Sequence, residues 1–262
     1  MTEQSQTKIV LLTGASSGIG LSLAHIFARE GYSLILVSRD QTKLQTVKQE
    51  LEKDSQQKIY SIAKDLSLPT SAQEVFDEVQ KLGVTITALV NNAGWGDYGS
   101  FDESDRNKQL NMIDLNVRTL TELTHLFLPM IRAQKVGYIL NVSSILGFVP
   151  GPFMSVYAAT KAYVLSFSEA IREELRGSSV SVTALCPGQT ATNFFKRTLE
   201  ESKEAFETIG MNSDEVAHIG YTAMVNRKAV VVAGVKNKIF TFLPRLLPRQ
   251  LVTRITRWII TK

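Results

Sequence analysis

The chain has 262 residues, 44% of them hydrophobic, with 29 Lys and Arg against 25 Asp and Glu. This length supports a large buried core, and no linker or shift in composition marks a boundary between domains. A single cysteine, Cys186, excludes an intrachain disulfide and fits a reducing compartment. No run reaches the roughly 18 apolar residues of a membrane span, and the polar residues 1–7 lack the core of a signal peptide. We therefore expect a soluble cytoplasmic protein with a disordered N-terminus at residues 1–7.

Charge is distributed unevenly along the chain. Residues 216–262 contain nine Lys and Arg and no Asp or Glu, so the remaining chain holds 29 − 9 = 20 basic against 25 acidic residues. The net charge of +4 therefore originates in the C-terminal part. The three histidines, His25, His125 and His218, are too far apart in sequence for the usual spacing of metal ligands, and we expect no metal site.

The first motif is a glycine-rich turn between an apolar run and a helical pattern. Residues 8–13 are predicted to form a strand, and Leu23, Ile26 and Phe27 repeat at helical spacing. Glycines in such a turn permit the backbone N–H groups to approach a pyrophosphate at the helix N-terminus. The alternative is a plain turn between strand and helix. The hydroxyl groups of Thr13, Ser16 and Ser17 disfavour it, because they could bind a phosphate or brace the loop. The candidate cofactor-binding residues are Gly14, Ser16, Ser17, Gly18, Ile19 and Gly20.

The second predicted strand, residues 32–38, ends in Ser38-Arg39-Asp40. Many NAD enzymes have a carboxylate at this strand end for the adenosine ribose, whereas an arginine accommodates the 2′-phosphate of NADP. Ser38 occupies the expected position of the carboxylate, so we favour NADP(H) over NAD(H), with Arg39 pairing with the phosphate. Alternatively, Arg39 only begins the next helix, which Asp40 would cap.

Further strands are predicted at residues 57–63 and 87–90, and the second of these leads into the turn Asn92-Ala93-Gly94. Small residues there would let the backbone approach a cofactor between the two halves of the sheet. Asn91 has an equally plausible structural role. Residues 103–133 read as a long helix whose apolar face is interrupted by Asn116, a residue that needs hydrogen-bond partners if it is buried.

The central motif is the pair Tyr157 and Lys161, four residues apart in a helical pattern and therefore on one helix face. A fixed ammonium stabilises a phenolate, so we expect Lys161 to lower the pKa of Tyr157. Such a pair is ordinarily a plain surface contact. Ser144, however, follows the predicted buried strand at residues 138–140, and strand ends carry the chemistry of α/β sheets.

Together these motifs resemble the short-chain dehydrogenase/reductase family in its classical form, over about residues 8–234. The resemblance implies that Ser144, Tyr157, Lys161 and Asn116 are catalytic, with Asn116 holding a water that links Lys161 to solvent. It implies adenine contacts from Asp65 and Leu66, and nicotinamide contacts from the loop after a strand at residues 180–186. It also implies a substrate lid at residues 193–210. The loop residues concerned are Pro187, Gly188, Thr190 and Thr192.

The alternation of strands and helices predicts one doubly wound α/β domain at residues 8–235, with a seven-stranded parallel sheet in the order 3-2-1-4-5-6-7 and helices on both faces. The last strand is expected at residues 229–233. Residues 236–262 would form a basic amphipathic extension, helical after Pro248, with its apolar side formed by Leu247, Leu251, Val252, Ile255, Trp258 and Ile259. That side would cover the subunit, a partner subunit or an anionic membrane.

The expected reaction is hydride transfer between NADP(H) and a hydrophobic ketone or aldehyde, with Tyr157 as general acid and base. One alternative is a carrier-linked 3-oxoacyl reductase whose acidic carrier docks on the basic surface. An alternative of another class is a non-catalytic dinucleotide-binding or membrane-associated scaffold. We expect a homodimer or homotetramer and no nucleic acid. The expected substrate-lining residues, for which ordinary core packing is an equal alternative, are Trp95, Tyr98, Leu146, Phe148, Phe153, Phe194 and Phe195.

Overall fold

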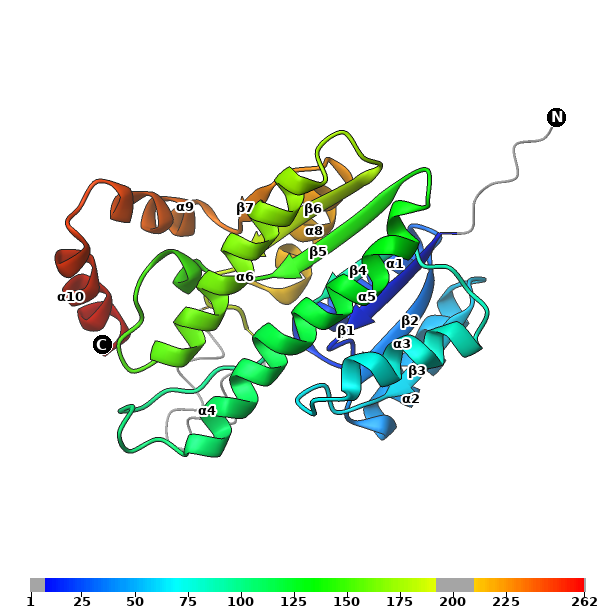
Figure 1. Cartoon of the computed structure of the whole chain (residues 1–262), viewed down its shortest axis with the longest axis horizontal. Helices are drawn as coiled ribbons and strands as arrows, with labels where there is room; N and C mark the ends of the chain where they lie inside the picture. Colours follow the sequence, from blue (N-terminus) through cyan, green and yellow to red (C-terminus); the bar gives the residue numbers. More distant parts are fainter. Residues whose placement is uncertain (1–7, 192–209, 262) are drawn as a thin grey trace.

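The computed structural model describes residues 8–191 and 210–261. Its centre is a parallel sheet of seven strands in the order β3-β2-β1-β4-β5-β6-β7, which confirms the predicted topology (Figure 1). The order reverses between β1 and β4, and a doubly wound sheet binds ligands at such a switch point. The strands are β1 (Ile9–Thr13), β2 (Ser33–Ser38), β3 (Ile59–Ala63), β4 (Ala88–Asn91), β5 (Gly137–Val142), β6 (Val180–Cys186) and β7 (Val230–Val232).

Helices cover both faces of the sheet. One core packs the sheet against α1 (Gly18–Arg29), α2 (Gln41–Asp54) and α8 (Ser213–Val225). The other packs it against α3 (Ser71–Lys81), α5 (Leu120–Arg132) and α6 (Ser155–Glu174). Successive residues of β1 alternate between the two cores, as the pleat of a strand requires, so apolar residues are needed at every position.

The strands lie where the apolar runs predicted them, with small differences at their ends. One concerns β5, which was expected at residues 138–140 and runs from Gly137 to Val142. Another concerns β3, which was expected from residue 57 and begins at Ile59. The Ser55 hydroxyl accepts a hydrogen bond from the Gln57 N–H at 3.1 Å, so a local turn takes the donor that a strand would have paired. The predicted N-terminal disorder concerns residues 1–7, which lie outside the described residues.

The helix predicted over residues 103–133 is divided into three parts. It begins as α4 (Arg106–Ile113), continues as a π-helical segment η1 (Asp114–Thr119) and ends as α5. Asn116 lies within η1, and its side chain hydrogen-bonds to the backbone of Trp95 in both directions. A π-helical turn often marks a functional position, because the wider helix places a side chain where an α-helix would not.

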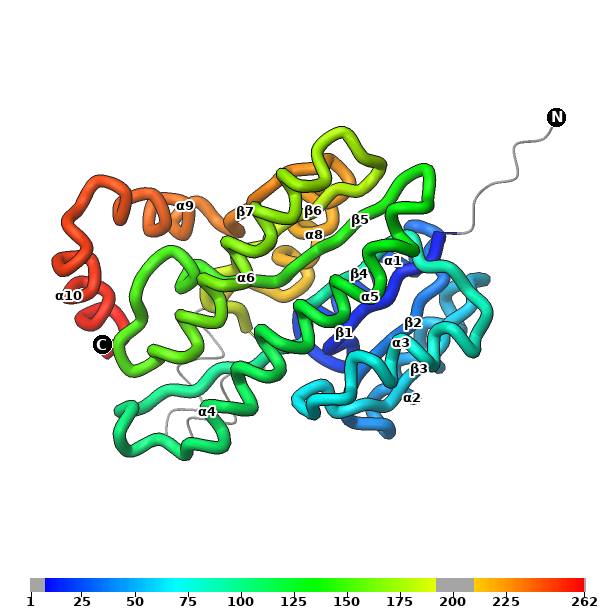
Figure 2. The backbone as a smooth tube through the Cα atoms, in the orientation of Figure 1, coloured from blue at the N-terminus to red at the C-terminus, as the bar shows by residue number. Residues whose placement is uncertain are grey.

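The C-terminal part forms more helix than the sequence predicted. Beyond α10 (Arg249–Ile260), which begins directly after Pro248 as expected, the structure contains α9 (Val235–Phe242) and a 3₁₀ turn η3 (Leu243–Arg245). The two helices lie at one end of the molecule, and residue 8 lies toward the opposite end (Figure 2). Among residues 8–191 and 210–261, no helix has the length and hydropathy to cross a membrane.

Candidate active site

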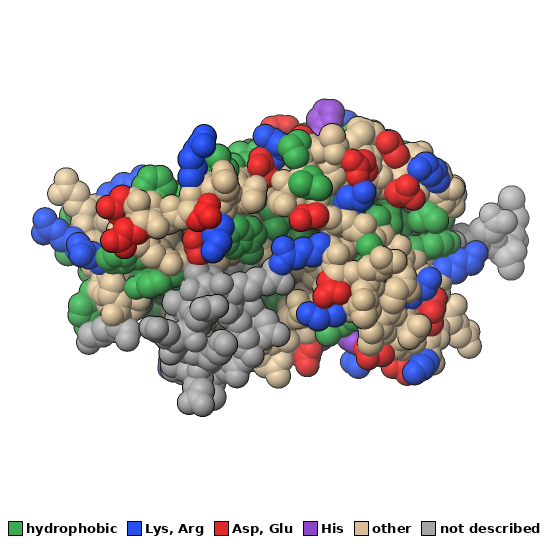
Figure 3. All heavy atoms as spheres, turned by 90° about the horizontal axis from the view of Figure 1, so that it is seen from below, with side chains coloured by type: hydrophobic (Ala, Val, Ile, Leu, Met, Phe, Trp, Pro, Cys, Tyr) green, Lys and Arg blue, Asp and Glu red, His purple; other side chains and the backbone are tan. Residues whose placement is uncertain are grey.

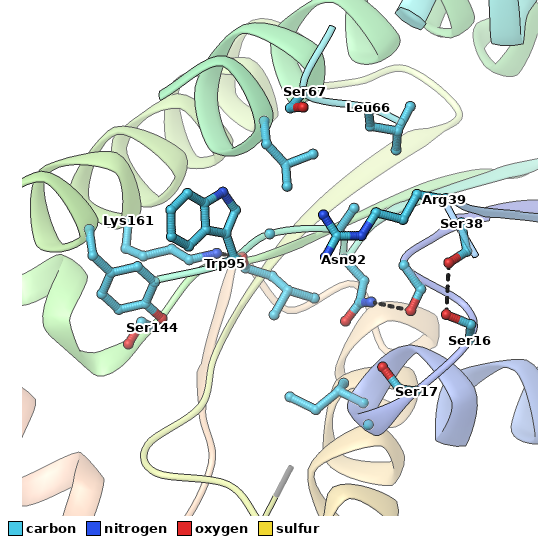
Figure 4. A pocket seen from close by; sticks show the side chains of 18 of the residues that line it. Ser16, Ser17, Ser38, Arg39, Leu66, Ser67, Asn92, Trp95, Ser144 and Lys161 are labelled. Atoms are coloured by element: carbon cyan, nitrogen blue, oxygen red, sulfur yellow. Dashed lines mark hydrogen bonds between the residues drawn. The ribbon is translucent and has the colours of Figure 1, made fainter. Parts of the chain in front are cut away.

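A cavity of about 400 Å³ opens at the carboxyl ends of the strands, on both sides of the switch between β1 and β4. It extends from Ser16, Ser38 and Arg39 at one end to Ser144 and Lys161 at the other, with Asn92 and Trp95 between them (Figure 4). Its walls contain most of the residues predicted as cofactor-binding or catalytic. These are Gly14, Ser16, Ser17, Gly18, Ile19, Arg39, Asp65, Leu66, Asn92, Ala93, Gly94, Ser144, Tyr157, Lys161, Pro187, Gly188 and Thr190.

Two predicted residues in the described part of the chain, Gly20 and Asn116, are not on the cavity wall. Gly20 lies one residue inside α1 from the lining segment, and Asn116 lies behind the wall in η1. Thr192 lies outside the described residues, as do most of the lid predicted at residues 193–210 and the aromatic pair Phe194 and Phe195. The predictions for Thr192, for the lid and for this aromatic pair therefore stay predictions.

The glycine loop is held tightly against the turn after β4. The Asn92 amide nitrogen donates to the backbone oxygens of Thr13 and Gly14 at 3.0 and 3.2 Å. The Thr13 hydroxyl accepts from the N–H groups of Asn92 and Ala93, both at 3.0 Å. A Cβ at Gly20 would lie 2.1 Å from the Gly14 carbonyl oxygen, so this helix start and this loop meet with no room for a side chain.

This arrangement fits a dinucleotide. Ser17 is the N-cap of α1 and makes no side-chain cap hydrogen bond, and Gly18 and Ile19 of the first turn line the cavity. The N-terminus of a helix binds anions through its free N–H groups and its dipole, so the first turn of α1 is suited to a pyrophosphate. Gly18 has a φ of +54°, a conformation that favours glycine.

Beside the start of α1, the cavity wall carries hydroxyls and cations. Ser16 and Ser38 share a hydrogen bond of 2.7 Å between their hydroxyls, and Arg39 lies beside them (Figure 4). Asp40 caps α2 by accepting from the Lys43 N–H at 3.1 Å, as the alternative predicted. Arg39 precedes this cap and is not part of the helix, so the other half of that alternative is wrong. Arg39 is therefore available to the cavity.

Lys64 and Ser67 also line this end, and neither was predicted. Lys64 forms an ion pair with Glu74 of α3. The carboxylate of Asp65 accepts from the N–H and the hydroxyl of Ser67 at 3.0 and 2.7 Å, which holds the turn after β3. Other lining residues that sequence reasoning missed are Asn111, Leu115, Val142 and Ser143. Lys64, Ser67 and Ser143 could have been predicted, because each is next in the sequence to a predicted site residue after a strand.

Ser144, Tyr157 and Lys161 meet at the inner end of the cavity. Ser144 follows β5, where its hydroxyl accepts from the Leu146 N–H at 3.2 Å. Tyr157 and Lys161, one turn apart on α6, are both buried, and Tyr157 forms a side-chain hydrogen bond with Ser144. The Lys161 ammonium donates to the Val142 carbonyl at 2.9 Å and lies 5.8 Å from the centre of the Tyr157 ring.

The electrostatics of this group differ from the expectation. Burial raises the pKa of Tyr157 to about 12, and the hydrogen bond from Ser144 is the opposing influence. The predicted lowering of this pKa by Lys161 is not observed, because the desolvation of the phenolate raises the pKa by more than the neighbouring groups lower it. Burial likewise lowers the pKa of Lys161 to about 8. At neutral pH the phenol is therefore protonated and the ammonium still mostly charged.

Asn116 makes the contacts of a structural polar residue. Its Oδ1 accepts from the Trp95 N–H at 3.1 Å, and its Nδ2 donates to the Trp95 carbonyl and to the Thr160 hydroxyl at 3.0 and 3.1 Å. Both amide hydrogens are thus used. Asn116 is still close to Lys161, because a Cβ at Gly94 would lie 2.9 Å from Asn116 Oδ1 and 3.4 Å from Lys161 Nζ.

The expected apolar wall for a substrate is present in part. Trp95, Tyr98 and Leu146 pack around Tyr157, together with Met112, Met154, Val156 and Ile260. The Phe153 ring lies 6.0 Å from that of Tyr98. Phe148 was wrongly assigned to this wall: it packs against a separate cluster with Leu165, Ala184 and Cys186, because the 3₁₀ turn η2 (Ile145–Phe148) directs it to β6.

Comparison with known proteins agrees with this geometry. The chain is 31% identical over 231 residues to a very-long-chain 3-oxoacyl-CoA reductase of Rattus norvegicus, covering 82% of this chain and 72% of that protein. It is 37% identical over 190 residues to a sulfoacetaldehyde reductase of Chromohalobacter salexigens, covering 72% and 74% of the two chains.

Among solved structures, a short-chain dehydrogenase from Sphingobium yanoikuyae in complex with NADPH superimposes with a TM-score of 0.81 and 31% identity over 91% of both chains. The family model for short chain dehydrogenase matches residues 8–203, which include the glycine loop, Ser144, Tyr157 and Lys161. The chain therefore belongs to the short-chain dehydrogenase family and has its oxidoreductase fold.

Proposed function

We propose that the protein is an NADP(H)-dependent oxidoreductase that interconverts a hydrophobic ketone or aldehyde and its alcohol. The observation that carries this proposal is the group of Ser144, Tyr157 and Lys161, buried together at one end of a cavity whose other end contains Arg39. When bound, the nicotinamide would supply the hydride in reduction or accept it in oxidation. The protein's own residues would then bind the carbonyl and move the proton.

In the proposed mechanism, the Ser144 hydroxyl donates a hydrogen bond to the substrate carbonyl oxygen. The Tyr157 phenol, protonated at neutral pH, transfers its proton to that oxygen as negative charge develops on it. The Lys161 ammonium stabilises the phenolate that remains. Lys161 is held in place for this role by the Val142 carbonyl at 2.9 Å, which uses one of its three donors and leaves two.

We propose that Asn116 helps to resupply the proton. Because its Nδ2 hydrogens bond Trp95 and Thr160, a water held by this side chain would have to donate to Oδ1. Oδ1 accepts one hydrogen bond, from the Trp95 N–H, and an amide oxygen has a second lone pair. The proximity of Gly94 to both Asn116 Oδ1 and Lys161 Nζ supports a short route between the two residues.

The proposed preference for NADP(H) is supported by the side chains at the adenosine end. Ser16, Ser38 and Arg39 offer hydroxyl and guanidinium donors, which suit a 2′-phosphate, and β2 ends in Ser38 rather than a carboxylate. The relative from Sphingobium yanoikuyae was solved with NADPH. Asp65 and Leu66, on the turn after β3, would contact the adenine, while Pro187, Gly188 and Thr190 would contact the nicotinamide.

A 3-oxoacyl thioester is the second candidate substrate class. It is supported by the likeness to the very-long-chain 3-oxoacyl-CoA reductase and by the apolar wall of Trp95, Tyr98 and Leu146. The non-catalytic scaffold is disfavoured, because a protein that only sensed a dinucleotide would not need a buried Tyr157 hydrogen-bonded to Ser144 beside a buried Lys161.

We propose that the protein forms a homodimer or homotetramer through the outer side of α6 and η1. An apolar groove lies there between Val117 and Ala159. Ile113, the last residue of α4, and Tyr163 of α6 are 40% and 37% exposed. Apolar side chains on two facing helices are typical of a self-complementary interface.

Replacing Tyr157 by Phe should lower kcat for carbonyl reduction by about 10²- to 10⁴-fold, because the proton donor is removed. NADPH binding, measured by fluorescence titration, should change little. Tyr163→Phe is the matched control, since it removes a phenol hydroxyl from the same helix that bonds Thr121 instead of Ser144. Retention of half the activity by Tyr157→Phe would remove the assigned role.

The rate of reduction should decline with pH through the titration of Lys161. Its pKa of about 8 lies below that of Tyr157, at about 12, so the ammonium loses its charge first. We expect kcat/KM to be level below about pH 7 and to fall as pH rises through about 8, with Tyr157 still protonated. A rate constant that stays level from pH 7 to pH 10, measured with NADPH saturating, contradicts the role of Lys161.

Replacing Arg39 by Ala should weaken NADPH binding by about tenfold or more and leave NADH binding nearly unchanged, because only NADPH carries the 2′-phosphate. Lys48→Ala is the control: it removes a cation from α2 at a position that does not line the cavity. Equal losses for the two cofactors would show that Arg39 does not recognise the phosphate.

A substrate panel distinguishes the two candidate classes. NADPH oxidation should be compared for aliphatic, aromatic and steroid ketones and for 3-oxoacyl-CoA thioesters of increasing chain length. If the apolar wall binds the chain, kcat/KM should rise with its length, by about fourfold per added methylene that becomes buried. A preference for short, charged aldehydes would contradict a hydrophobic substrate.

A further inference from the structure

The C-terminal helices expose an unusual amount of apolar surface. We call this surface the outer face; it consists of Val235, Ile239, Phe242, Leu243, Leu246, Leu251, Ile255, Trp258 and Ile259, each between 39% and 73% exposed. Val235, Ile239 and Phe242 form one stripe on α9, and Leu251, Ile255, Trp258 and Ile259 form one stripe on α10, as spacings of three and four residues require.

The opposite side of each helix is fixed to the domain. On α10, Val252 and Thr256 are buried, and Ile260 packs against the cluster that contains Tyr157. On α9, the Asn237 amide donates to the Ala233 carbonyl at 2.6 Å, and its side chain is in contact with the backbone at Gly188. The sequence left open whether the apolar side of this helix covers its own subunit, a partner subunit or an anionic membrane. In the structure Val252 is buried against the domain, and the outer face is exposed.

Charge identifies the kind of partner that fits this surface. Residues 235–261 contain six cations and no Asp or Glu: Lys236, Lys238, Arg245, Arg249, Arg254 and Arg257. In Figure 3, cationic and hydrophobic side chains lie side by side at the end of the molecule formed by these helices. Two copies facing each other through this surface would bring twelve cations together, which disfavours self-association there. A partner that fits this surface must offer an apolar region to its hydrophobic side chains and negative charge to its Lys and Arg side chains.

We propose that the outer face is a docking surface for an anionic lipid bilayer. Its apolar side chains would enter the boundary between headgroups and acyl chains, and the Lys and Arg side chains would pair with lipid phosphates. Trp258 fits this position, because an indole combines an apolar body with a polar N–H group. The two helices lie along the bilayer and do not cross it.

Docking would bring the bilayer close to the active site. α10 contacts the cluster around Tyr157 through Ile260, and the Arg257 guanidinium lies 5.5 Å from the centre of the Phe153 ring in the loop before α6. The bilayer would therefore lie about one helix diameter, roughly 10 Å, from the cluster that contains Tyr157. Docking does not itself depend on the reaction, so its test uses binding and not activity.

The experiment measures sedimentation of the full chain with vesicles of phosphatidylglycerol and phosphatidylcholine in equal parts, and with vesicles of phosphatidylcholine alone. We expect binding to the anionic vesicles at low salt, and weaker binding at high salt or without the anionic lipid. The variant Leu251→Gln/Ile255→Gln/Ile259→Gln should lower the partition coefficient by at least about tenfold. Circular dichroism verifies that it is folded.

The matched control is Leu68→Gln/Leu82→Gln/Val136→Gln, which removes three comparably exposed apolar side chains elsewhere and should leave binding unchanged. A second variant, Lys238→Gln/Arg245→Gln/Arg254→Gln, should also weaken binding and reduce its dependence on salt. Absence of binding by the full chain at low salt overturns the proposal.

Two other outcomes assign the surface to a different partner and also overturn the proposal. If only the charge variant loses binding, the surface is purely electrostatic and fits an acidic protein. If the apolar variant has a lower mass than the full chain in sedimentation velocity without lipid, a second copy covers the outer face.

Discussion

The cavity depends on the close approach of two loops that follow neighbouring strands, β1 and β4. Thr13 and Asn92 join them: the Thr13 hydroxyl accepts two backbone N–H groups from the second loop, and the Asn92 amide donates to two carbonyls of the first. Glycine is required at two positions. A Cβ at Gly14 would lie 2.7 Å from Asn92 Nδ2 in the second loop, and a Cβ at Gly20 would lie 2.1 Å from the Gly14 carbonyl oxygen. The start of α1, and with it the proposed pyrophosphate site, is positioned by this contact.

A second polar network connects the sheet to α6. The Asn91 amide donates to Asn141 Oδ1 at 2.9 Å across β4 and β5, and Asn141 Nδ2 donates to the Ser168 hydroxyl of α6 at 2.9 Å. The Ser143 hydroxyl donates to the Lys161 carbonyl at 2.7 Å. These buried bonds fix α6 against β5, so that Tyr157 and Lys161 face Ser144. Asn91 therefore has the structural role that was left open for it.

Burial has opposite consequences for the two titrating groups of the site. It makes Tyr157 a weaker acid, with a pKa of about 12, and lowers the pKa of Lys161 to about 8. A phenol that keeps its proton at neutral pH suits the proposed carbonyl reduction, in which it would donate that proton. The expectation that Lys161 would lower the pKa of Tyr157 considered the positive charge and omitted the desolvation of both groups. Desolvation depends on how the chain packs around these residues, which their spacing in the sequence does not reveal.

The sequence alone predicted the strand order and the edge of the sheet at which the cavity lies, and through the family resemblance it predicted the group of Ser144, Tyr157 and Lys161. The strands and the edge follow from the pattern of the chain, because buried parallel strands require continuous apolar runs and their carboxyl ends meet at one edge. Only the tertiary structure decided what depends on contacts between distant residues: the use of both Asn116 amide hydrogens, the departure of Phe148 from the substrate wall, and the presence of Lys64 in the cavity. It also decided which stripe of α10 is buried, because helical periodicity shows that a helix has an apolar side but not which part of it meets the domain.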